Sequence, residues 1–174
     1  MRTIMFCLAI LLAQATSAAV LYNVVDLGPG IACGISDNGY IMGGDASGQL
    51  WRMKDTVKQS FSVPVFSGRI NSSGQMVGGS LDGSYFYCDG VTLTSWVSSR
   101  RWPNYPDFFN INSHGVAVGQ GANPAQCYTI VNGVRTALPS DYLGACAIND
   151  SGAIAGDSLS GHALFVQAAD GSVT

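Results

Sequence analysis

Short apolar runs alternate with polar, glycine-containing turns along the chain from about residue 20 onward. One nine-residue pattern occurs four times: isoleucine, Asn or Ser, two polar residues, glycine, any residue, two apolar residues and a second glycine. The copies begin at Ile35, Ile70, Ile111 and Ile148, which are 35, 41 and 37 residues apart. A pattern repeated at this spacing predicts equivalent structural units. We therefore expect the four isoleucines to occupy matching buried positions.

Each unit has the pattern of a β-hairpin. A polar turn separates two strand-like segments, and the glycine that closes the turn suits a positive φ, which other residues resist. These turn glycines are Gly39, Gly74, Gly115 and Gly152. A second turn and a third, more apolar strand follow in each unit, and a weaker fourth strand leads to the next isoleucine. Three to four strands in about 37 residues is the size of a propeller blade.

The sequence therefore predicts an all-β fold of four short β-repeats, arranged as a small β-propeller in one domain, residues 20–174. A β-solenoid or a β-prism-like stack is the alternative arrangement. Charged residues make up only 11% of the chain, with two lysines and no glutamate, which argues against exposed helices. The formal net charge is −3 and no basic stripe occurs, so nucleic acid is disfavoured as a partner.

Residues 1–19 have the pattern of a signal peptide. Arg2 precedes an apolar run at residues 4–13, and small residues at 15–19 provide a cleavage site. The apolar run is short for a transmembrane helix, although an uncleaved anchor is the alternative. We predict a secreted protein, extracellular or periplasmic, with no membrane span after cleavage.

Three short motifs occur in the fourth unit, and an Asp-Leu-Gly element occurs near the start of the chain. These segments are Ile148-Asn149-Asp150-Ser151-Gly152, Ile154-Ala155-Gly156, His162-Ala163-Leu164-Phe165 and Val25-Asp26-Leu27-Gly28. In these motifs the chain resembles the HAF family of extracellular repeat proteins. The resemblance covers essentially all of residues 20–174, although the first three units lack the His-Ala pair. It implies export and a repeat fold, and it implies no established activity.

Four cysteines follow the predicted signal peptide, and an even number in an exported chain permits two disulfides. Cys33 and Cys146 each stand two residues before the isoleucine of the first and fourth units, which are neighbours only if the units close into a ring. Cys33–Cys146 is therefore a candidate disulfide. No cysteine pair has metal-binding spacing, so no cofactor is predicted. Calcium is the one cation considered, because Asp, Asn and Ser crowd the turns, but these turns are shorter than a calcium loop.

One segment, residues 96–109, departs from the repeat and falls in its longest spacing. It combines arginines, aromatic residues and two prolines that would stiffen a loop. Binding sites favour aromatic and Arg side chains held on loops, so this segment is the candidate ligand site, although its aromatics could instead pack on a sheet. The candidate residues are Arg100, Arg101, Trp102 and Tyr105.

No catalytic residue is predicted. The chain has no Gly-x-Ser-x-Gly elbow, and its two histidines, His114 and His162, have ordinary turn and strand positions. We predict an exported, non-catalytic binding or surface-interaction module for a glycan or an envelope partner. One alternative is a secreted hydrolase using aspartates such as Asp45 and Asp157, which follow the second glycine of the first and fourth units. Another is a structural fragment of a longer repeat array.

Overall fold

The computed structural model describes residues 26–80, 83–97, 110–120, 127–140, 142–158 and 164–167. Within these ranges the chain forms fifteen β-strands and no helix. The strands build four antiparallel sheets, one for each unit of the sequence repeat. The predicted all-β fold of four short repeats is therefore confirmed. The predicted signal peptide, residues 1–19, lies outside the described residues, as do residues 20–25 at the start of the predicted domain.

Strands that follow one another in the sequence lie side by side in every sheet. The first sheet contains β1 (Gly30–Ile35), β2 (Ile41–Asp45), β3 (Gln49–Lys54) and β4 (Val57–Pro64). The second contains β5 (Ser67–Ile70), β6 (Met76–Gly79), β7 (Ser84–Cys88) and β8 (Leu93–Val97). The third contains β9 (Asn110–Ile111), β10 (Ala117–Gln120), β11 (Cys127–Val131) and β12 (Val134–Ala137). The fourth contains β13 (Tyr142–Ile148), β14 (Ile154–Ser158) and β15 (Leu164–Gln167).

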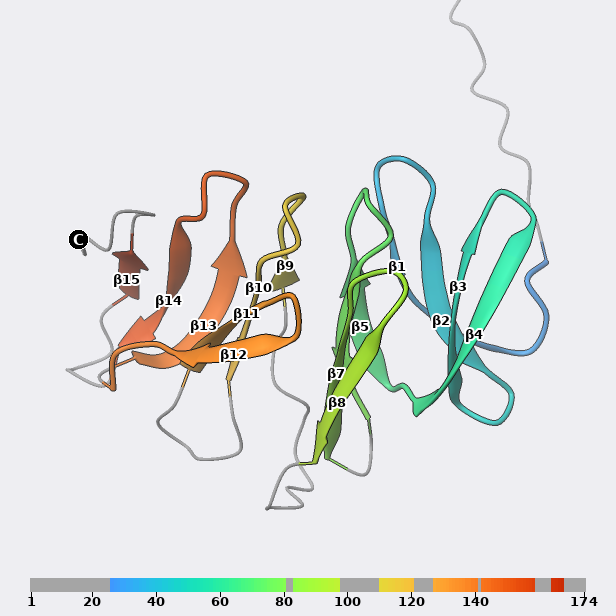
Figure 1. The fold of residues 1–174 in the computed structure, drawn as a ribbon, viewed down its shortest axis with the longest axis horizontal. Helices are drawn as coiled ribbons and strands as arrows, with labels where there is room; N and C mark the ends of the chain where they lie inside the picture. Colours follow the sequence, from blue (N-terminus) through green and yellow to red (C-terminus); the bar gives the residue numbers. More distant parts are fainter. Residues whose placement is uncertain are drawn as a thin grey trace, which may run out of the picture.

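The four sheets stand next to one another in sequence order, with the first at one end of the array and the fourth at the other (Figure 1). Each sheet packs on its sequence neighbours through side chains, as blades do in a β-propeller. The repeat turns all lie at the upper side of the array in this view. No helix in the described ranges is long and apolar enough to cross a membrane.

The repeat turn forms as the sequence predicts. In the second unit the amide of Gly74 donates to the carbonyl of Asn71 at 2.9 Å, and the Asn71 amide donates to the Gln75 carbonyl at 3.0 Å. The glycine then needs a left-handed backbone to bring the chain into the next strand. All four turn glycines have it, with φ of 86° at Gly39, 76° at Gly74, 82° at Gly115 and 83° at Gly152. The predicted positive φ is confirmed.

The second glycine of the repeat makes room for an aromatic ring. Gly78 on β6 pairs with Phe86 on β7, and a Cβ at Gly78 would stand 2.8 Å from the Phe86 ring. In the first sheet Gly43 pairs with Trp51 in the same way, at 2.7 Å. The ring therefore lies across the neighbouring strand. The glycine is explained by close approach, because a Cβ would meet the ring and, closer still, the backbone carbonyl oxygen of Ser67 at Gly78 and of Ile31 at Gly43.

Three apolar layers hold the four sheets together. The layer between the first and second sheets includes Met42, Leu50, Met76 and Phe86, all fully buried. The other two layers lie between the second and third sheets and between the third and fourth. The layers arise because alternate residues of each strand point to opposite faces, so that adjacent residues such as Met76 and Val77 enter different layers. Every inner sheet is consequently buried on both faces.

Polar side chains of the repeat turns also join neighbouring sheets. Asn71 and Asn112 are buried, and each Oδ1 accepts hydrogen bonds from amides of its own turn. The Asn71 Nδ2 donates to the Asn112 carbonyl at 2.8 Å, and the Asn112 Nδ2 donates to the Asn149 carbonyl at 3.0 Å. We call this series the asparagine ladder. It satisfies buried polar groups while fixing the register of one sheet against the next.

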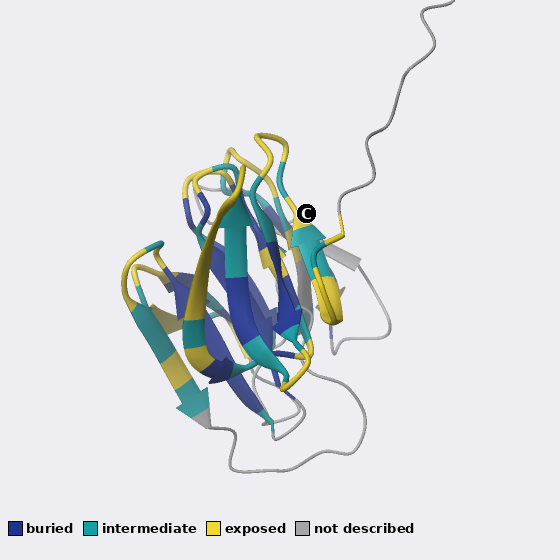
Figure 2. Cartoon of the chain, turned by 90° about the vertical axis from the view of Figure 1, so that its right-hand side faces the viewer, coloured by how far each residue is buried: buried dark blue, intermediate teal, exposed yellow. Residues whose placement is uncertain are grey.

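The repeat isoleucines are not all equivalent in burial. Ile70 and Ile111 are 7% and 8% exposed, and Ile148 packs at the edge of the third layer. Ile35 is 73% exposed, so the prediction that all four are buried is wrong for the first unit. The physical reason is that the repeat isoleucine packs on the sheet before its own, and the first sheet stands at an end of the array. Figure 2 looks onto this end, where β1 and β4 carry exposed residues.

Candidate functional site

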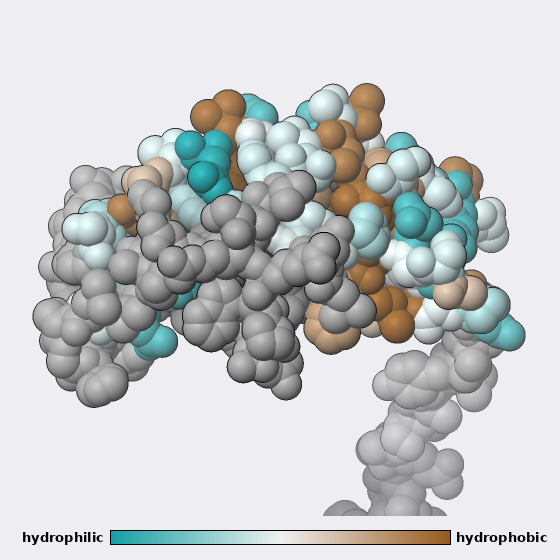
Figure 3. All heavy atoms as spheres, turned by 90° about the horizontal axis from the view of Figure 1, so that it is seen from below, coloured by the Kyte–Doolittle hydropathy of each residue, from teal (hydrophilic) through white to brown (hydrophobic). Residues whose placement is uncertain are grey.

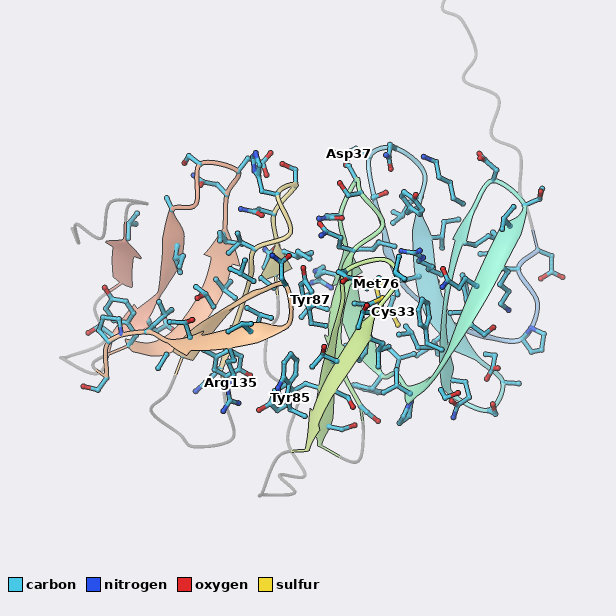
Figure 4. The ribbon with its side chains drawn as sticks, in the orientation of Figure 1. Cys33, Asp37, Met76, Tyr85, Tyr87 and Arg135 are labelled. Atoms are coloured by element: carbon cyan, nitrogen blue, oxygen red, sulfur yellow. The ribbon has the colours of Figure 1, made fainter. Side chains whose placement is uncertain are left out.

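The most distinctive group of side chains lies between the second and third sheets, and we call it the aromatic–arginine cluster. Its members come from one central and one outer strand of each sheet: Tyr85 on β7, Trp96 on β8, Tyr128 on β11 and Arg135 on β12. Strand register explains the grouping. Tyr85 and Trp96 are direct partners across β7 and β8, so both point toward the third sheet. Figure 4 shows Tyr85 and Arg135 facing each other at the lower side of the array.

The rings of the cluster are stacked. The Tyr85 centroid lies 5.6 Å from that of Trp96 and 6.1 Å from that of Tyr128, with interplanar angles of 28° and 25°. The Arg135 guanidinium carbon lies 4.9 Å from the Tyr128 centroid, and its Nη1 donates to the Tyr85 hydroxyl at 2.6 Å. The two tyrosines are buried, Trp96 is half-buried and Arg135 is exposed. The cluster therefore presents an indole and a cation to the surface on a rigid base.

A second arginine shows what a purely structural role looks like in this fold. Arg52 on β3 is half-buried between the first and second sheets. It donates to the carbonyls of Gly74 and Gly90 and to the Gln59 side chain, and it lies within 6 Å of the Tyr40 and Phe61 ring centroids. Its N–H groups are thus used inside the fold, by Gln59 in its own sheet and by the Gly74 and Gly90 carbonyls of the second sheet. Arg135, by contrast, makes one hydrogen bond among the described residues, which leaves other N–H groups for a ligand.

The predicted ligand site stands next to this cluster in the sequence. Its residues Arg100, Arg101, Trp102 and Tyr105 lie outside the described residues, so their prediction is untested. Trp96 is the first residue of the segment that the sequence singled out, and it belongs to the cluster. Tyr85, Tyr128 and Arg135 were missed because each fits an ordinary strand pattern. No signal in one sequence tells which strands of adjacent sheets will face each other.

Asp45 and Asp89 each accept hydrogen bonds within their own turns. The Asp45 carboxylate accepts hydrogen bonds from the Ser47 hydroxyl at 2.7 Å and from the Ser47 and Gln49 amides at 2.8 and 3.0 Å. These bonds, first the one from the Ser47 hydroxyl, lower the pKa of Asp45. The pKa of Asp89 is lowered in the same way, chiefly by the Val91 amide. A general acid needs a raised pKa, so these two carboxylates are poorly suited to that role.

Cys33, Cys88 and Cys127, the cysteines whose side chains the structure describes, are all free thiols. Cys33 is a free thiol whose Sγ lies 3.8 Å from the Phe66 carbonyl oxygen, so the predicted Cys33–Cys146 disulfide is not formed. The physical reason is that the first and fourth sheets lie at opposite ends of the array (Figure 1). The Cys146 side chain lies outside the described residues. Burial raises the pKa of Cys33 and of Cys88, which disfavours a reactive thiolate at either.

Among the described residues, no group of three or more His, Cys, Asp or Glu side chains could hold a metal ion. His114 lies in the third repeat turn, with its Nδ1 3.4 Å from the Ser113 hydroxyl. The Ser113 amide donates to the Asp150 carboxylate of the next turn at 2.8 Å, and this bond is the main cause of a lowered Asp150 pKa. Ser113 stands between the carboxylate and the imidazole. This order differs from a catalytic triad, in which the imidazole stands between the other two groups.

Comparisons with known proteins show the fold. Neither a family model nor a curated protein matches the chain. Virginiamycin B lyase from Staphylococcus aureus is similar at a TM-score of 0.51 and 15% identity, over 80% of this chain and 52% of that one. A streptogramin B lyase structure is similar at a TM-score of 0.53 and 12% identity, over 88% of this chain and 55% of that one. A protein of unknown function from Bacteroides caccae is similar at a TM-score of 0.50 and 12% identity, over 89% of this chain and 63% of that one.

These neighbours support the β-propeller-like arrangement that the sequence predicted. The chain spans between about half and two thirds of their length, with coverages of 52%, 55% and 63%. Identities of 12–15% carry the fold alone, so no lyase chemistry follows for this chain. The resemblance to the HAF family stays a prediction.

Proposed function

We propose that this chain is an exported, non-catalytic binding module and that the aromatic–arginine cluster is where it binds a glycan. The observation that carries the proposal is the pairing of a half-buried indole with an exposed guanidinium on a base of stacked, buried tyrosines. Sugar rings lie flat on aromatic faces, and their hydroxyl or carboxylate oxygens accept from Arg. Trp, Tyr and Arg are also the side chains that contribute most binding energy at recognition sites.

The cluster is preorganised, which favours binding. Tyr85 is fixed by stacking on two rings and by the hydrogen bond from Arg135. A ligand would therefore not have to order these side chains, and the entropy cost of binding is reduced. The proposed loop residues Arg100, Arg101, Trp102 and Tyr105 begin three positions after β8 ends at Val97. In this proposal they add further aromatic and cationic contacts to the same ligand.

The alternative of a secreted hydrolase has less support. It requires two carboxylates, one with a raised pKa, on either side of a bound substrate. Of the two candidates, Asp45 instead has a lowered pKa because it accepts hydrogen bonds within its own turn, and Asp157 lies exposed on β14 of the fourth sheet.

The experiment measures glycan binding by the parent chain and by Arg135→Ala and Trp96→Ala variants. We expect at least a ten-fold loss of affinity in each. Lys58→Ala is the matched control, because Lys58 also lies over an aromatic ring, 4.8 Å from the Trp51 centroid, but in the first sheet. Its affinity should match that of the parent.

Circular dichroism of each variant separates loss of binding from loss of fold. Trp102→Ala tests the proposed loop with the same glycan. Unchanged affinity in both Arg135→Ala and Trp96→Ala would place the site elsewhere, and a parent chain that binds no glycan on a broad array would refute the proposed ligand class.

A further inference from the structure

Each sheet has two unlike faces, and neighbouring sheets always join one of each. The isoleucine face carries the repeat isoleucine, and the far face is the opposite side. In the contact between the first two sheets, Met42 on the far face of the first meets Ile70 and Met76 on the isoleucine face of the second. At the next contact, Val77 on the far face of the second sheet meets Ile111 on the isoleucine face of the third. The order of faces is therefore constant along the array.

One face of each kind is left over at the two ends. On the isoleucine face of the first sheet, Ile35 is 73% exposed, whereas Ile70 and Ile111 at the same repeat position are 7% and 8% exposed. On the far face of the fourth sheet, Ala155 pairs with Val166, which is 47% exposed. Figure 3, seen from below, shows a separate group of hydrophobic residues at the surface where the first and second sheets adjoin. Ile35 and Ala155 are thus less buried than the residues at the same repeat positions inside the array, since Met42, Val77 and Val118, which match Ala155, are fully buried whereas Ala155 is half-buried.

The polar groups at the two ends are complementary as well. The third turn reaches the fourth through two bonds: Asn112 Nδ2 donates to the Asn149 carbonyl, and the Ser113 amide donates to the Asp150 carboxylate. Asn149 and Asp150 occupy the repeat positions of Asn112 and Ser113, so they offer the same two donors onward. Ser36 and Asp37 in the first turn occupy the positions of the acceptors. Asp37 lies exposed at the upper side of the first sheet (Figure 4).

We propose that the isoleucine face of the first sheet docks on the far face of the fourth sheet of a second copy of this chain. The two faces of one copy cannot meet because they lie at opposite ends of the array (Figure 1). A second copy supplies the missing face with the same side-chain order that joins the sheets within the chain. Two polar bonds are expected at the contact, from Asn149 Nδ2 to the Ser36 carbonyl and from the Asp150 amide to the Asp37 carboxylate. Such a contact is heterologous, because it joins two different surfaces.

The test measures the molar mass of the purified full chain by light scattering over a range of concentrations. We expect oligomers that dissociate on dilution. Ile35→Asp blocks one face and Val166→Asp blocks the other, so each variant alone should be monomeric. Their equimolar mixture should form a heterodimer, because the I35D copy keeps an intact far face and the V166D copy keeps an intact isoleucine face. Val91→Asp is the matched control, since Val91 is 86% exposed in a turn of the second sheet.

Asp37→Ala tests the polar part of the contact without adding a charge to an apolar face. It should raise the dissociation constant about ten-fold, the effect of losing one charge-assisted hydrogen bond. Circular dichroism establishes that the variants fold. A parent chain that stays monomeric at every concentration would overturn the proposal. So would an oligomer that persists in V166D, which would mean that two isoleucine faces meet each other, or one that is lost in V91D.

Discussion

Replacing Ile70 by alanine should remove a large part of the adhesion between the first two sheets. Ile70 is 7% exposed and packs in the layer that contains Met42 and Met76. The change deletes three buried carbon atoms, worth about 0.8 kcal/mol each, or about 2.4 kcal/mol before any cavity is counted. The cavity that remains brings the expected loss of unfolding free energy to about 2–5 kcal/mol.

The same substitution at Ile35 provides the internal comparison. Ile35 occupies the same repeat position but is 73% exposed, so Ile35→Ala should change the unfolding free energy by less than about 0.5 kcal/mol. Urea titrations followed by tryptophan fluorescence measure both values, at a concentration low enough to keep the chain monomeric. Equal losses in the two variants would refute the reasoning, because burial by the preceding sheet is the only difference invoked between the two positions.

Two further predictions concern the turns. Gly39 has φ of 86°, and a Cβ added there would meet no atom within 4 Å, so only backbone strain opposes a side chain at this position. Gly39→Val should therefore lower the unfolding free energy, measured by thermal unfolding, by about 1–2 kcal/mol. Gly39→Asn should lower it by clearly less, and equal losses in the two variants would contradict the strain argument. The pKa of Asp45 is lowered in the folded chain, first by the hydrogen bond from the Ser47 hydroxyl. The ionised carboxylate therefore stabilises the fold above about pH 4, and this contribution is lost as the pH falls through the folded pKa. The urea midpoint should drop less between about pH 6 and pH 3 in Asp45→Asn than in the parent, and an identical drop would exclude this contribution.

The repeat could be predicted from the sequence because its determinants are local. The turn glycines adopt the expected positive φ, and the units became sheets with the expected strands. The turn between β3 and β4 forms in the same way, with Asp55 taking φ of 54°, close to the 50° of Asn132 in the equivalent turn of the third sheet. Short-range sequence decides such conformations, because only a few residue types tolerate a left-handed backbone.

The contacts between sheets could not be predicted in the same way. The exposure of Ile35 depends on what stands in front of the first sheet, and the repeat pattern around Ile35 is the same as that around Ile70. The aromatic–arginine cluster depends on Tyr85 and Arg135 meeting across 50 positions of sequence. The wrong Cys33–Cys146 pairing has the same origin, because it assumed that the two ends of the array adjoin.

The asparagine ladder has a consequence for the order in which the chain assembles. Each rung needs the turn of only the next unit, so Asn71 requires the backbone of Asn112, and Asn112 requires that of Asn149. Each rung spans 41 or 37 residues, which is about one unit, and neighbour-by-neighbour growth is typical of such arrays. The second and third sheets, which gain contacts on both faces, are then the natural nucleus. The outer sheets join last and are the first to fray, so local opening should spread inward from both ends of the molecule.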